Sequence, residues 1–160
     1  MKGSVLTSLA ASALLSGCAS VPSFPVPDST WQTFRGQLQY VTEGNRVIGE
    51  FAVSRRNGEF RLEFSKGGAV PLIRVSRHQG YGRAEGALAR GSWEGLATKA
   101  PDALSGWVNE VPRGFAGLGT IELAAKSAAR TPGVPGGSAP RRMEIEGTRE
   151  GERFVFIFGQ

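Results

Sequence analysis

Hydrophobic and polar residues alternate over much of the chain after residue 30, with the period of two that is typical of β-strands. The alternation is clearest on both sides of Asn57-Gly58, a dipeptide that favours a two-residue hairpin turn because both residues tolerate positive φ. With this turn, two apolar pairs face each other on one side of the sheet: Phe51 with Phe64 and Val53 with Leu62. The sequence therefore predicts an antiparallel hairpin with one apolar face and one polar face.

A second hairpin is predicted at the C-terminal end of the chain, where two alternating segments flank Glu150-Gly151. With these residues as the turn, the predicted register pairs Ile145 with Phe156 and Met143 with Phe158. The aromatic side chains at positions 154, 156 and 158 then lie on one side of the strand and give it a large apolar surface.

Shorter strands and one helix are predicted between the two hairpins. Residues 70–76 and 83–88 have strand character, and Pro71 suits an edge strand or the first residues of a strand. From Pro101 the period changes to that of a helix, with one apolar stripe: Leu104, Trp107, Val108 and Val111. Pro112 is predicted to end this helix, and glycine and proline predict loops at 114–119 and 131–140.

These elements predict a mainly β (α+β) fold, in which a curved antiparallel sheet or half-open β-barrel is covered by one or two short helices. One helical stripe is a small cover for two apolar hairpins, so either the sheet closes on itself or a concave apolar surface remains for a ligand. The residues expected to line such a lipid-binding surface are Phe51, Val53, Leu62, Phe64, Trp107, Phe154 and Phe156. The alternative is that the same residues form only the packed core.

The N-terminal residues form a charged, apolar and small-residue series that ends in a cysteine. A short positive start is followed by an apolar stretch at 5–15, which is too short to span a bilayer, since that takes ~20 residues. The stretch ends in Leu15-Ser16-Gly17-Cys18, which contains the single cysteine of the chain and resembles the lipobox. The resemblance implies that the Cys18 thiol is acylated and that residues 1–17 are removed. A signal peptide with a chance cysteine, or an uncleaved helix, are the alternatives.

Acylation would anchor the protein to a membrane, because two or more acyl chains give stable attachment. In enterobacterial lipoproteins an aspartate after the cysteine retains the protein at the inner membrane. Ala19 at that position therefore implies the outer membrane, with the folded part facing the periplasm. Three prolines within residues 18–30 predict an extended tether, and residues 31–160 are expected to form a single domain.

Composition narrows the function further. Lys+Arg number 19 against 14 Asp+Glu, for a formal charge of +5, but the cations are scattered without a basic run, so no nucleic-acid partner is expected. One cysteine excludes an internal disulfide. His78 stands beside Arg77 in a glycine-rich stretch and is interpreted as a solvated loop residue, and Glu144 and Glu146 as solvated strand residues. In the absence of hydrolase, metalloprotease or P-loop motifs, neither catalysis nor a metal or cofactor is expected.

Four stretches together resemble the LolA/LolB lipoprotein-localisation family: Trp31 with Phe34–Leu38, Gly49–Phe64, Leu104–Pro112 and Pro140–Ile145. The resemblance implies a half-open β-barrel with a helical lid and an apolar cavity for lipoprotein acyl chains. It also implies that the protein accepts or inserts lipoproteins in the outer membrane. The expected partners are then the membrane itself, a periplasmic lipoprotein carrier and lipoprotein acyl chains.

A second function fits the same sequence. An anchored structural or assembly accessory lipoprotein would need only the acyl group and a protein-binding surface, without a ligand. The two functions differ in whether the folded part binds lipid.

Overall fold

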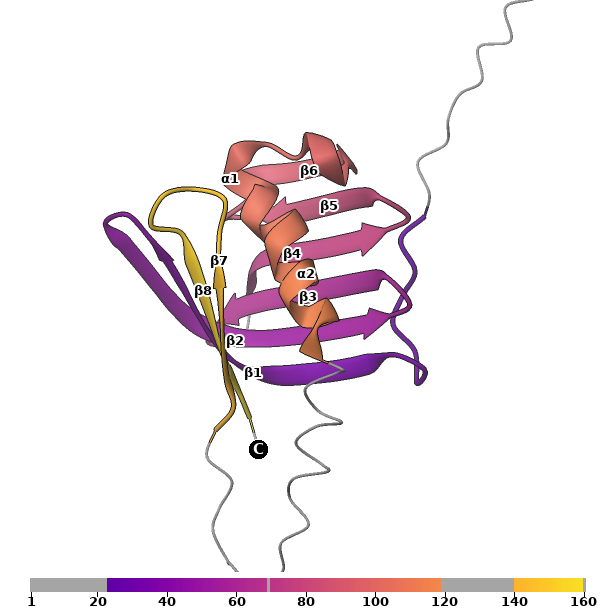
Figure 1. Cartoon of the computed structure of the whole chain (residues 1–160), viewed down its shortest axis with the longest axis horizontal. Helices are drawn as coiled ribbons and strands as arrows, with labels where there is room; N and C mark the ends of the chain where they lie inside the picture. Colours follow the sequence, from indigo (N-terminus) through magenta and orange to yellow (C-terminus); the bar gives the residue numbers. More distant parts are fainter. Residues whose placement is uncertain (1–22, 69, 119–139, 160) are drawn as a thin grey trace, which may run out of the picture.

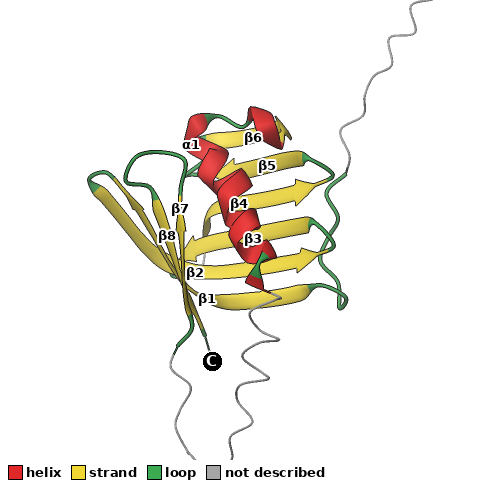
Figure 2. Ribbon diagram, viewed as in Figure 1, coloured by secondary structure: helices red, strands yellow, loops and turns green. Residues whose placement is uncertain are grey.

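The computed structural model describes residues 23–68, 70–118 and 140–159. These residues form an eight-stranded antiparallel sheet that curves around one helix and does not close on itself (Figures 1 and 2). The strand order is β6-β5-β4-β3-β2-β1-β8-β7. The strands are β1 Gln32–Thr42, β2 Asn45–Arg56, β3 Glu59–Lys66, β4 Val70–His78, β5 Tyr81–Gly86, β6 Gly91–Leu96, β7 Arg142–Glu146 and β8 Arg153–Phe158.

This architecture confirms the predicted mainly β fold with a curved sheet and a short helical cover. The Asn57-Gly58 turn is also confirmed, since both residues have positive φ, at 43° and 80°. The register of β2 and β3 is the predicted one, with Phe51 opposite Phe64 and Val53 opposite Leu62.

The C-terminal hairpin forms, but its predicted register is wrong by two residues. Ile145 pairs with Phe154 and Met143 with Phe156. The loop is longer than a two-residue turn and is closed by the backbone N–H of Gly147, which donates to the carbonyl oxygen of Glu152 at 2.8 Å. A shift of two residues keeps every side chain on its face of the sheet, so the predicted sidedness of the aromatic residues survives.

The helix extends further than predicted. It runs without a break through α1 (Asp102–Ser105), the π-helical segment η2 (Gly106–Glu110) and α2 (Val111–Ala116), after the 3-10 turn η1 (Ala97–Lys99). Its apolar stripe is buried as predicted, but Pro112 does not end it. The N–H of Val111 donates to the carbonyl of Gly106, five residues back. Pro112 therefore follows a point where the regular α-helical ladder is already interrupted, and its missing N–H leaves no further gap.

The middle strands agree with the prediction in part. β4 lies between β3 and β5, so of the two positions predicted for Pro71, the first residues of a strand are confirmed and an edge strand is excluded. β6 was not predicted, because its sequence, Gly-Ser-Trp-Glu-Gly-Leu, has little apolar alternation. The predicted signal peptide 1–17, Cys18, the start of the tether and nearly all of the loop 131–140 lie outside the described residues.

The core lies between the concave face of the sheet and the helix. Trp107 is its centre, with ring centroids 4.7 Å from those of both Tyr40 and Phe154. Further along the helix, Phe115 packs edge-on against Phe156, with 4.9 Å between their centroids. Aromatic side chains from the sheet and the helix thus occupy the interior.

Candidate functional site

The seven residues predicted to bind lipid all lie in this core. Phe51 is 3% exposed and the other six are fully buried. None of them lines either of the two cavities at the ends of the strands. The structure therefore places them together, packed against one another and the helix, and their contact with lipid stays a prediction.

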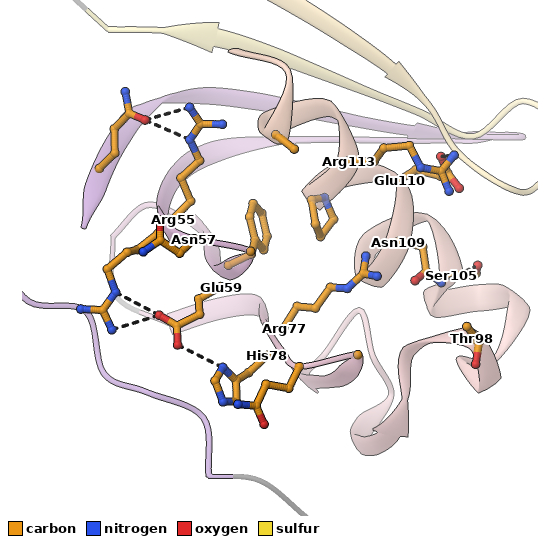
Figure 3. A pocket seen from close by; sticks show the side chains of 18 of the residues that line it. Arg55, Asn57, Glu59, Arg77, His78, Thr98, Ser105, Asn109, Glu110 and Arg113 are labelled. Atoms are coloured by element: carbon orange, nitrogen blue, oxygen red, sulfur yellow. Dashed lines mark hydrogen bonds and ion pairs between the residues drawn. The ribbon is translucent and has the colours of Figure 1, made fainter. Parts of the chain in front are cut away.

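Two cavities lie at opposite ends of the strands. The larger, here called the flank cavity, has a volume of about 1300 Å³ and lies between the β2–β3 and β4–β5 turns and one side of the helix (Figure 3). The smaller, here called the tip cavity, has about 800 Å³ and lies between the β1–β2 and β5–β6 turns, the β7–β8 loop and the start of the helix. The helical residues on the flank cavity are Ser105, Asn109, Glu110, Pro112, Arg113 and Ala116.

Three paired residues lie side by side on the sheet side of the flank cavity. Arg55 of β2 pairs with Phe60 of β3, which pairs with Arg77 of β4. Paired residues of neighbouring strands project from the same face, and Phe60 is buried with its ring 5.9 Å from that of Phe115 on the helix. The rim row (Arg55, Phe60 and Arg77) therefore places two guanidinium groups next to the apolar residues of the concave face.

Arg55 attaches the sheet to the end of the helix. Its guanidinium donates to the backbone carbonyl of Phe115 and to Gln32 Oε1, the latter at 2.8 and 3.0 Å. It also lies 5.4 Å from the centre of the Phe34 ring. These contacts hold the C-terminal end of α2 against β1 and β2.

Arg77 differs from the other cations of the cavity. Within the part of the chain that the structure describes, no hydrogen bond or ion pair joins its guanidinium, which extends towards the helix in Figure 3. Arg113 lies 2.9 Å from Glu110. The cavity is lined by four arginines and two glutamates, a formal excess of two positive charges with His78 neutral.

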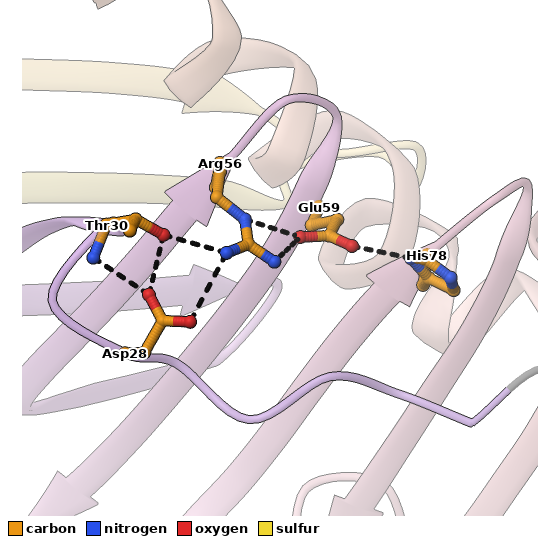
Figure 4. A network of polar contacts seen from close by, with 5 residues as sticks. All are labelled: Asp28, Thr30, Arg56, Glu59 and His78. Carbon is orange, nitrogen blue, oxygen red and sulfur yellow. Dashed lines mark hydrogen bonds and ion pairs between the residues drawn. The ribbon is translucent and has the colours of Figure 1, made fainter.

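A polar network joins the end of the predicted tether to the turn-side end of the sheet (Figure 4). This tether clasp consists of Asp28, Thr30, Arg56, Glu59 and His78. Arg56 bridges Asp28 at 3.3 Å and Glu59 at 3.0 Å, and Glu59 lies 3.1 Å from His78 Nδ1. Hydrogen bonds from Thr30, together with the charge of Arg56, lower the pKa of Asp28. His78 is therefore half-buried beside a carboxylate at the end of β4, and not a solvated loop residue as predicted.

The tip cavity contains a buried carboxylate that sequence reasoning missed. Glu152 is 2% exposed, and it accepts hydrogen bonds from Tyr40 Oη at 2.9 Å, Arg149 Nη2 at 2.8 Å and the N–H of Thr148 at 3.1 Å. We call Tyr40, Arg149 and Glu152 the buried cluster. Burial, then the charge of Glu152, raises the pKa of Tyr40 to about 12. The sequence contained one indication of this inward orientation. Residues two positions apart on a strand face the same side, and 152 lies two positions before the inward-facing series 154, 156 and 158.

Two glycines make room for this carboxylate. A Cβ atom on Gly106 would lie 2.5 Å from Glu152 Oε2, and one on Gly147 would lie 2.1 Å from it. Larger residues at these positions would displace the carboxylate from its donors. Glycine at both positions is thus part of what allows the β7–β8 loop to fold inward.

The remaining predicted site residues form no chemical centre. Glu144 pairs with Arg142 and Arg153 on the outside of the sheet, at 3.2 and 3.3 Å. Among the described residues, no three His, Cys, Asp or Glu side chains converge as metal ligands, and no helix has the length and apolarity needed to cross a bilayer. Comparison with protein-family models finds no match, and comparison with curated proteins finds none either.

Proposed function

We propose that the chain is a lipid-anchored envelope protein that binds acyl chains between its helix and the concave face of its sheet. In this proposal it accepts or inserts lipoproteins at the outer membrane, attached there through Cys18. The observation that carries the proposal is the flank cavity, which runs along the helix beside an interior of aromatic and aliphatic side chains. An open, curved sheet with one helical cover offers such an interior without the need to unfold the sheet.

The interior is filled, so an acyl chain must replace contacts now made by the helix. Apolar burial is non-directional, at about 0.8 kcal/mol for each CH₂ and 1.5–3 kcal/mol for each large apolar side chain. About ten methylenes therefore offset roughly the four side chains of the helical stripe. Replacing the helix by an acyl chain in the interior then changes the free energy little, as reversible binding requires.

The polar attachments of the helix within the described residues are few. Arg55 donates to the carbonyl of Phe115, and Asn109 Nδ2 donates to the carbonyl of Ala97 at 3.0 Å. The π-helical segment Gly106–Glu110, which contains Asn109, interrupts the regular α-helical hydrogen-bond ladder of this helix. We infer that the helix pivots away from the sheet at the flank cavity when Arg55 releases it.

Saturable binding of a fluorescent fatty acid to the unacylated Cys18→Ser chain tests this function. Arg55→Gln removes a charge-assisted bond that holds the helix closed, and we expect it to strengthen binding by roughly tenfold. Arg46→Gln is the matched control, because Arg46 lies on the same strand and, within the described residues, its guanidinium hydrogen-bonds to Gln39 and not to the helix. Absence of saturable binding in all three chains would overturn the proposal. A stoichiometric envelope protein partner without bound lipid would instead favour the accessory function.

The anchor has its own test. Cells that express the protein with radiolabelled palmitate should yield a labelled chain in the membrane fraction. Cys18→Ser should remove the label and shift the chain out of that fraction. If the variant fractionates like the parent, the lipoprotein interpretation of the N-terminus is wrong.

A further inference from the structure

Arg77 occupies a position that a sheet interior normally reserves for apolar residues. It follows Ile73 and Val75 on the concave face of β4, and both of these are fully buried. On β3 its paired neighbour is the buried Phe60. A guanidinium next to an apolar core is costly unless an anion or another acceptor compensates it. Within the described residues, no such acceptor contacts Arg77.

The nearby acidic groups on the cavity wall are engaged elsewhere. Glu110 lies 2.9 Å from Arg113, and Glu59 lies within the tether clasp, 3.0 Å from Arg56. The Ser105 hydroxyl accepts from Asn109 at 3.3 Å, which leaves its own hydrogen free to donate. The cavity thus combines an unpaired, inward-facing guanidinium with a further donor on the helix.

We propose that the flank cavity binds a phosphate group, held by Arg77. A guanidinium presents a planar, two-pronged set of donors that matches phosphate oxygens, and the positive excess of the cavity favours an anion over a neutral group. Phe60, Pro112 and Ala116 line the same cavity and provide an apolar surface next to the anion. The class of ligand that combines both features is an amphiphile with a phosphate headgroup. That the phosphate carries an acyl chain rests on the proposed function, whereas the anion site itself does not.

Titration calorimetry on the full-length, unacylated Cys18→Ser chain tests this assignment with three probes. They are inorganic phosphate, a single-chain phosphate monoester (lysophosphatidic acid) and the neutral monoacylglycerol of the same chain length. We expect the phosphate monoester to bind at least tenfold more tightly than the neutral lipid, because one charge-assisted pair separates them. Arg77→Gln should abolish this difference.

Arg74→Gln is the matched control. It removes the same charge from the same strand, but Arg74 lies on the outer face and pairs with Glu63 and Glu85. This variant should keep the tenfold preference. Equal affinity of the native chain for the charged and neutral lipids, or equal loss in both variants, would overturn the phosphate site.

The three probes separate the two proposals. Arg77-dependent binding of inorganic phosphate without binding of either lipid would sustain the anion site and overturn the acyl-chain function. Binding of both lipids with equal affinity would sustain the acyl-chain function and overturn the anion site. If inorganic phosphate does not compete with the phosphate lipid, the site is specific for a lipid headgroup. If it does compete, the site binds free phosphate as well.

Discussion

An inward-facing charge has hydrogen-bond partners at one end of the strands and none among the described residues at the other. At the end beside the tip cavity, Glu152 is buried and its carboxylate accepts bonds from two side chains and one backbone N–H. At the end beside the flank cavity, Arg77 faces the same interior without a partner among the described residues. Both are single charges on the concave side of one sheet, so the difference lies in their surroundings.

This contrast separates a structural charge from a candidate functional one. A buried charge with a complete set of partners fixes a loop and a register, as Glu152 does for β7 and β8. A half-buried charge without partners contributes little to folding and remains available to a ligand. Substitutions at the two ends of the strands should therefore change the unfolding free energy by unequal amounts.

The largest effect is expected at Glu152. Glu152→Ala leaves the Tyr40 hydroxyl and the Thr148 N–H without their acceptor and breaks the pair with Arg149, which should cost about 3 kcal/mol of unfolding free energy. Urea denaturation measures it. The control is Glu150→Ala, an exposed position in the same loop, which should change stability by less than about 0.5 kcal/mol. Equal effects of the two substitutions would contradict a structural role for the buried carboxylate.

A smaller effect is expected at Tyr40. Tyr40→Phe removes one donor to Glu152 and should cost about 1 kcal/mol at neutral pH. Because folding raises the pKa of Tyr40 from 10.0 to about 12, the unfolded chain releases this proton first. The stabilisation is thus complete below pH 10 and is lost as the pH rises towards 12. Denaturation midpoints between pH 8 and 11 should fall more steeply for the native chain than for Tyr40→Phe, and parallel curves would count against this coupling.

The effect at the opposite end should be close to zero. Arg77→Leu removes an inward-facing charge that has no partner in the described part of the chain, so unfolding free energy should stay within about 0.5 kcal/mol or rise. Thermal denaturation at matched ionic strength measures it. A loss of more than about 1 kcal/mol would show that Arg77 supports the fold, and the contrast with Glu152 would then disappear.

The smallest effect is local and concerns the tether clasp. The pKa of Asp28 lies below its ordinary value of 3.8, so its contacts persist above that pH and are lost as the pH falls through the lower folded value. Asp28→Asn should weaken the ion pair with Arg56 at neutral pH and speed hydrogen exchange of the Thr30 amide, which donates to Asp28 Oδ1 at 2.8 Å. Global stability should not change. Asp102→Asn, on the helix, should leave that amide unaffected.

The short-range pattern of hydrophobic, polar and turn residues was sufficient to predict the elements that depend on neighbouring residues. The Asn57-Gly58 turn places its two strands in register because the turn geometry and the apolar alternation agree. The helical stripe from Leu104 to Val111 was equally visible, since its spacing is that of one helix face. The seven candidate lipid-binding residues were correctly placed on apolar faces, but pattern alone does not separate a cavity wall from a packed core.

Long-range contacts determined the features of the structure that the sequence did not predict. The helix passes Pro112 because a π-helical turn precedes it and the core holds both halves against the sheet. The loop between the C-terminal strands contains a carboxylate that reaches Tyr40, more than a hundred positions earlier in the chain. The rim row joins three strands, and the place of Arg77 in it follows from the pairing of β4 with β3, which contains a register shift between Phe64 and Ser65. The amino-acid order thus specifies periodicity and turns, which are local properties, whereas the placement of charges next to the core depends on which strands become neighbours when the sheet curves around the helix.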